Sequence, residues 1–92
     1  MFCVTEMFGK TNAYWTNNQE YNLLFLKNQR KYTQDKFDVR GYIYMNEIYE
    51  AFGLTWHPEY FNPVFTKDSG RILNVEFTPV ERTNNIRIDL EY

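Results

Sequence analysis

The sequence predicts an α+β fold in which a small antiparallel sheet is covered on its apolar face by one longer and one shorter helix. Apolar and polar residues alternate over 73–78 and again over 86–92, which is the pattern of strands with one wet face. Apolar residues recur at helical spacing between 21 and 32, and a short helical pattern covers 46–52. A chain of 92 residues is expected to form one domain, 1–92, with a modest core.

The longer helix is expected over about 17–35. Thr16 and Asn17 can each open it with a capping box, because Gln19 and Glu20 follow three residues later. One apolar helical face then comes from Tyr21, Leu24, Phe25 and Tyr32. The next four residues, 38–41, read Asp-Val-Arg-Gly and predict a turn.

A short strand at 42–44 and the shorter helix follow directly. Tyr-Ile-Tyr favours a strand, and Asn46 is expected to cap the helix over 46–52. Gly53 should end that helix in a left-handed conformation, with Leu54 folding back on it.

The C-terminal strands are expected to form a hairpin around the loop 79–85, with the strand near 42–44 in the same sheet. An exposed edge at 72–78 or 86–92 could pair two copies of the chain. A short strand is also predicted near 64–65, and a weaker strand pattern over 2–8 is interrupted by a glutamate.

Composition excludes several classes of protein. The net charge of −2 gives no general attraction to nucleic acid or to an anionic membrane, and no apolar run is long enough to span a bilayer. The lone Cys3 cannot form an internal disulfide, and residues 1–6 lack the pattern of a signal peptide, so a reducing cytoplasm is expected. Aromatic residues make up 20% of the chain, which suits either a thin core or a binding surface.

The residues needed for catalysis or metal binding are scarce. The chain has one histidine, His57, one serine, Ser69, and no Gly-rich phosphate loop. Glu47 and Glu50 are three residues apart and could pair as carboxylates, but they are expected on a solvated helix face. His57 has no Cys or His partner at ligand spacing. The sequence therefore predicts no enzyme, no cofactor and no metal site.

A basic cluster lies near the end of the longer helix. Residues 27–40 carry five basic side chains against two acidic ones. Such a cluster could hold a single-stranded nucleic acid through phosphate contacts and stacking, or it could simply complement the negative end of the helix dipole. The net negative charge favours the second interpretation. The nucleic-acid candidates are Lys27, Arg30, Lys31 and Lys36.

The loop at 56–61, Trp-His-Pro-Glu-Tyr-Phe, is the best candidate binding surface. Its rings are held by prolines, so they lose little entropy when a partner binds. The alternative is that Trp56 and Phe61 close the end of a small core, and both interpretations can hold together. The candidate partner-binding residues are Trp56, His57, Tyr60 and Phe61.

The stretch 40–54, RGYIYMNEIYEAFGL, resembles the central motif of a family of small phage and prophage proteins of Gram-positive bacteria with no known function. The pattern is Arg-Gly, an aromatic and aliphatic strand, Asn-Glu, and a short helix ending in Gly. The family commonly follows this helix with a Gly-Trp strand, where this chain has Val64-Phe65. The resemblance implies a phage origin and no particular activity.

These observations favour a non-enzymatic, phage-encoded protein-interaction module in the host cytoplasm, with inhibition of a host defence protein as one form of that role. Its partner would be a host or phage protein. Two alternatives remain: a virion or assembly component that self-associates, and a binder of single-stranded nucleic acid through the basic cluster.

Overall fold

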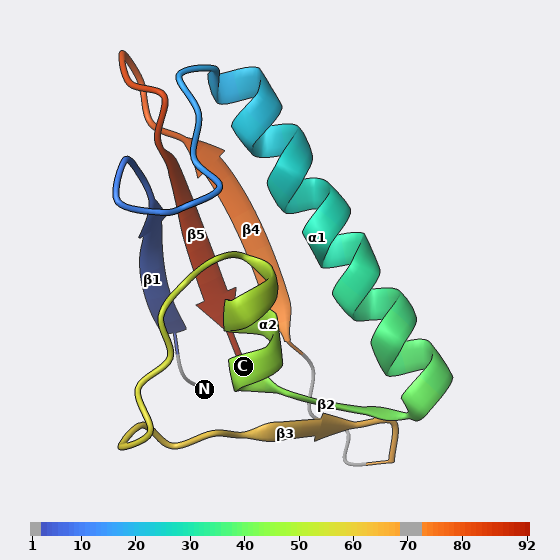
Figure 1. Cartoon of the computed structure of the whole chain (residues 1–92). Coiled ribbons are helices and arrows are strands. Elements are labelled where there is room, and N and C mark those ends of the chain that lie inside the picture. The colour runs from blue at the N-terminus through green and yellow to red at the C-terminus, as the bar shows by residue number, and fades with distance from the viewer. Residues whose placement is uncertain (1–2, 69–72) are drawn as a thin grey trace.

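The described part of the chain contains two helices and five strands, in the α+β class that the sequence predicts (Figure 1). The computed structural model describes residues 3–68 and 73–92. The elements follow in the order β1 (Cys3–Phe8), α1 (Gln19–Arg40), β2 (Tyr42–Tyr44), α2 (Met45–Ala51), β3 (Val64–Thr66), β4 (Asn74–Pro79) and β5 (Ile86–Glu91). The sequence of residues 67–70, Lys-Asp-Ser-Gly, also predicts a turn after β3, and its serine and glycine lie outside the described residues.

The larger sheet has three antiparallel strands in the order β1-β5-β4. The predicted C-terminal hairpin is confirmed, with Val75 opposite Leu90 and Phe77 opposite Ile88. The weak N-terminal pattern is also a strand, and it pairs with β5 along its whole length. The expectation that 86–92 offers a free edge is therefore wrong, because β5 is the central strand. The edges are β1 and β4.

The sequence suggested that the strand at 42–44 joins this sheet, and that expectation is wrong. This strand pairs with β3 in a separate two-stranded antiparallel sheet. The length of α1 explains the difference. Its 22 residues span about 33 Å and carry the chain past the end of β4 before β2 begins. Figure 1 shows the small sheet across that end of the molecule.

Both ends of α1 differ from the prediction. Asn18 is the N-cap, and its side chain accepts a hydrogen bond from the Tyr21 N–H at 3.0 Å. Thr16 does not cap, because its backbone N–H and hydroxyl both donate to Asn22. The helix also runs through 38–40, which the sequence assigned to a turn. It ends only at Gly41, whose φ of 82° is the left-handed conformation that favours glycine.

The start of α1 is tied to the β4–β5 loop by two amides. Asn22 is fully buried, and its Oδ1 accepts two hydrogen bonds while its Nδ2 donates to the carbonyls of Thr16 and Asn84. Gln19 Nε2 lies within 3.1 Å of the carbonyl oxygens of Val80, Thr83 and Asn85. These contacts fix the helix against the sheet at the end opposite β2.

The shorter helix begins one residue earlier than predicted, and Tyr44 takes the N-cap position expected of Asn46. The capping carboxylate is Glu47, which accepts from the Tyr44 N–H at 2.9 Å. The predicted stop is confirmed. Gly53 has a φ of 75°, its N–H donates to the Glu50 carbonyl, and the Leu54 N–H donates to the Tyr49 carbonyl.

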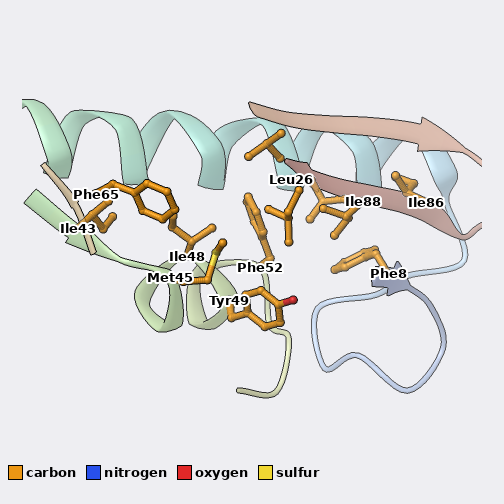
Figure 2. Close-up of a cluster of buried hydrophobic side chains, with 12 residues drawn as sticks. Phe8, Leu26, Ile43, Met45, Ile48, Tyr49, Phe52, Phe65, Ile86 and Ile88 are labelled. Carbon is orange, nitrogen blue, oxygen red and sulfur yellow. The ribbon is translucent and has the colours of Figure 1, made fainter. Parts of the chain in front are cut away.

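Among the described residues, the core is one cluster of twelve buried side chains from both sheets and both helices. Figure 2 shows it extending from Ile43 and Phe65 of the small sheet to Phe8 and Ile86 of the large one. The other members are Leu26, Met45, Ile48, Tyr49, Phe52, Val75, Ile88 and Leu90. Several of the aromatic residues therefore serve the core.

Candidate protein-binding surface

The aromatic loop is divided between the core and the surface. Trp56 is half-buried, packs on the core cluster, and meets the Tyr49 ring edge-on with 4.7 Å between ring centroids. Tyr49 is itself buried, and burial followed by the neighbouring Glu6 raises its pKa. Trp56 is therefore an anchor for the loop. Its ring also meets the Tyr60 ring edge-on with 5.5 Å between ring centroids, so it supports one of the other three candidate residues.

The remaining candidates point outward. Phe61 is 71% exposed and Tyr60 is 51% exposed. The His57 ring lies 5.1 Å from the Tyr60 ring, and the Tyr60 N–H donates to the His57 carbonyl at 2.9 Å. His57 Nδ1 also lies 3.8 Å from a Glu59 carboxylate oxygen, in a pair that is ionic only when the imidazole is protonated. The alternative that both Trp56 and Phe61 close the core is therefore confirmed for Trp56 and wrong for Phe61.

The end of the loop is fastened to the start of α2. The Met45 N–H donates to the Pro63 carbonyl at 3.0 Å, and the Asn46 N–H donates to Asn62 Oδ1 at 3.0 Å. Pro63 is fully buried. The asparagine predicted as a helix cap thus holds the loop through its backbone. The exposed rings are consequently presented from a fixed backbone.

Two further exposed rings lie on the small sheet. Tyr42 and Tyr44 alternate with the buried Ile43, so both point to the outer face of β2. Their rings meet edge-on at 6.2 Å, and the Arg40 guanidinium stacks over Tyr42 at 4.2 Å. Sequence reasoning treated these tyrosines as strand formers only. The sequence signal that could have revealed their exposure is the alternation itself, in which two large rings flank a single aliphatic residue.

The four exposed rings belong to one end of the molecule, where the loop leads into β3 and β3 pairs with β2 (Figure 1). We call Tyr42, Tyr44, Tyr60 and Phe61 the aromatic end. Tyr and Arg are enriched at the energetic centres of protein interfaces, and Arg40 stands beside this surface.

Near the aromatic end, the Glu47 carboxylate binds two cationic side chains, those of Arg40 and Lys36. Glu47 accepts two hydrogen bonds of 2.8 Å from Arg40, and Lys36 Nζ lies 2.9 Å from its Oε1. The Arg40 hydrogen bonds, with the Tyr44 N–H and Lys36, lower the pKa of Glu47 to about 2. The side chain is only 21% exposed. The expectation of a solvated Glu47 was wrong, because the carboxylate joins the two helices.

The basic cluster does not form one surface. Lys36 belongs to the Glu47 cluster. Lys27 is nine residues earlier, half a helical revolution around α1, and lies with Arg30 and Lys31 beside β4. Arg30 Nη1 donates to the Val75 carbonyl at 2.8 Å. The structure thus brings three of the four nucleic-acid candidates together and places the fourth elsewhere.

The other titratable candidates are not assembled into a site. Cys3 is exposed and unbridged, and the single serine lies outside the described residues. Within 3–68 and 73–92, no group of three or more His, Cys, Asp or Glu side chains is arranged to hold a metal ion.

In the same ranges, no helix has the length and apolar character needed to cross a lipid bilayer. Comparison with protein-family models, with curated proteins and with solved structures finds no significant match to this chain.

Proposed function

We propose that this chain is a non-enzymatic protein-interaction module that binds another protein through the aromatic end. The observation that supports the proposal is the exposure of Tyr60 and Phe61 on a loop whose backbone is bonded to the start of α2. An exposed ring on a fixed backbone can bury a large area in a partner with little loss of conformational entropy. Tyr42 and Arg40 add a ring and a cation of the kind found at interface centres.

The resemblance of residues 40–54 to phage proteins supports a host setting for this role. In that setting the module acts in the host cytoplasm, and its partner is a host protein, with a defence protein as one candidate. The chain has one free cysteine and no disulfide to lose, so reducing conditions do not threaten its fold.

The test is affinity capture from host lysate with quantitative mass spectrometry. The Phe61→Ala and Tyr60→Ala variants should each reduce recovery of the specific partner at least about tenfold, which is the loss of one interface anchor. Tyr21→Ala is the matched control, because Tyr21 is 55% exposed on α1 and does not belong to the aromatic end. Equal recovery of every partner by wild type, Phe61→Ala and Tyr60→Ala would disprove the proposal.

The two alternatives give different results. A self-associating virion component would show concentration-dependent mass in light scattering and would occur in purified particles. A binder of single-stranded nucleic acid would bind an oligonucleotide with an affinity that falls steeply as salt rises. Neither result depends on Phe61.

A further inference from the structure

The outer edge of β4 carries backbone groups suited to pairing. β4 pairs with β5 on one side, and in the described part of the chain no strand pairs with it on the other. The Val75 carbonyl accepts a hydrogen bond from Arg30 of α1 at 2.8 Å. Because a strand residue directs its N–H and C=O to the same side, Val75, and Phe77 two residues on, point theirs away from β5.

A groove runs between this edge and α1. Lys27, Arg30 and Lys31 line it from the helix, and residues 75–78 line it from the strand, around a volume of about 590 Å³. All three cations are exposed, and Glu76 is the one acidic residue among the lining residues of the described chain. Figure 1 shows α1 running alongside β4. The groove is therefore an open and positively charged channel.

The groove continues into a second hollow that is lined by apolar and polar residues together, Asp38 and Lys67 among them. Arg30 and Val75 line both spaces, and the second hollow, also about 590 Å³, has Phe37, Ile43 and Phe65 among its walls. A bound segment could thus leave its charged side chains against the lysines and place an apolar side chain at the end of the small sheet.

We propose that this groove binds an extended acidic peptide segment of a partner protein, which adds to the edge of β4 as a further strand. Side chains on one face of a strand are spaced about 6.6–6.8 Å apart, and successive turns of a helix rise about 5.4 Å. Alternate carboxylates of such a peptide can therefore meet Lys27 and Lys31, which are one turn apart on α1.

A peptide fits these features better than a nucleic acid. The edge of β4, where no strand pairs in the described part of the chain, matches a peptide backbone, which adds to a strand edge by β-augmentation; the Arg30 side chain that now bonds the Val75 carbonyl would give way to the peptide. The net charge of −2 also opposes a long polyanion, whereas a short acidic segment meets only the local positive groove. This surface is distinct from the aromatic end, so the proposal goes beyond the proposed function.

The direct test is fluorescence anisotropy with a panel of labelled peptides of about eight residues, matched to the length of a strand. In each peptide Glu alternates with Val, Leu, Phe or Thr, and a second panel has Lys in place of Glu. The Glu panel should contain saturable ligands and the Lys panel none. Lys27→Glu and Lys31→Glu should each weaken binding at least about tenfold. Lys10→Glu, a charge reversal at an exposed lysine in the turn after β1, is the matched control and should have little effect.

Backbone pairing has its own readout. Methylating alternate amides of the best peptide should abolish binding, and saturating peptide should slow hydrogen exchange of the Val75 and Phe77 amides. Phe61→Ala should leave this binding unchanged, which separates the groove from the aromatic end.

Four outcomes would overturn the proposal. These are no binding to any Glu peptide up to about 1 mM, equal binding to the Lys panel, full binding by the methylated peptide, and displacement of the peptide by oligo(dT) that binds through the same lysines. The last outcome would assign the groove to single-stranded nucleic acid.

Discussion

Arg40 and Glu47 face each other through two parallel hydrogen bonds, Nη1 to Oε1 and Nη2 to Oε2, each 2.8 Å long. The pair joins the last residue of α1 to the first turn of α2 across the whole of β2. A bidentate contact of this kind fixes orientation as well as distance. It thereby sets the direction of β2, which carries Tyr42 and Tyr44 of the aromatic end.

Protonation of Glu47 should destabilise the fold. The pKa of this carboxyl is about 2 in the folded chain against an ordinary value of 4.5. A carboxyl whose pKa is lowered by folding stabilises the folded state at pH values above its ordinary pKa. That stabilisation is lost as the pH falls toward the pKa of the folded state. Glu47→Gln should therefore cost on the order of 1–2 kcal/mol at pH 7 and almost nothing near pH 2. Urea unfolding of both proteins across this pH range measures the difference.

The control for Glu47 is Glu50→Gln, a substitution in the same helix at an exposed position. It should change the free energy of unfolding by less than about 0.5 kcal/mol. A Glu47→Gln penalty that is the same at pH 7 and pH 2 would contradict the assignment.

The two left-handed glycines should respond differently to alanine. A Cβ added at Gly41 would lie in open space, so Gly41→Ala should lower the free energy of unfolding only by the conformational strain, about 1–2 kcal/mol. At Gly53 an added Cβ would lie 2.6 Å from Asn12 Oδ1 and from the Tyr14 ring. Asn12 cannot move without breaking its hydrogen bond to the Phe52 carbonyl. Gly53→Ala should therefore cost about 1–2 kcal/mol more than Gly41→Ala in thermal or chemical unfolding. Equal costs would contradict this account.

Replacing the buried amide of Asn22 should be among the most damaging changes. Asn22→Ala leaves the Thr16 N–H and the carbonyls of Thr16 and Asn84 without a buried partner, at a cost of about 2–4 kcal/mol. Asn28→Ala, at an exposed position of the same helix, should be neutral or slightly stabilising because alanine favours helix. Circular-dichroism melts of the two variants test the contrast. A mild Asn22→Ala phenotype would mean that water replaces the amide.

Substitutions at the two ends of the aromatic loop should have different effects on the free energy of unfolding. Trp56→Ala removes a ring packed on Tyr49 and should cost about 2–3 kcal/mol, less than a fully buried Trp would. Phe61→Ala removes a ring that is 71% exposed and should change stability by less than about 0.5 kcal/mol. Comparison of chemical denaturation midpoints measures both. Similar losses in the two variants would show that Phe61 is packed in solution.

Local patterns predicted the elements better than their arrangement. Alternation at 73–78 and 86–92 revealed the hairpin, and Gly53 marked the end of α2, because these signals depend on neighbouring residues. The position of β5 in the centre of the sheet depends on a pairing with β1 from the other end of the sequence. No local pattern carries that information.

The misplaced boundaries have the same cause. α1 continues through 38–40 because Arg40 is held by Glu47, seven residues later, and Thr16 does not cap because a buried amide six residues later binds it. Each is a tertiary contact that overrides a local preference. In the candidate surface, the loop at 56–61 was found from its rings. The outward orientation of Tyr42 and Tyr44 could not be predicted without knowing which face of β2 is buried.

The order of strands in the larger sheet has a consequence for folding. β5 is the last strand in the sequence, yet both β1 and β4 depend on it for their hydrogen bonds. Until Ile86–Glu91 is available to pair, neither β1 nor β4 has its partner strand in this sheet. Helix α1 forms its backbone hydrogen bonds within one continuous segment and can begin to form earlier. Closure of the larger sheet therefore waits for β5, which must pair with a strand from the other end of the sequence as well as with its neighbour.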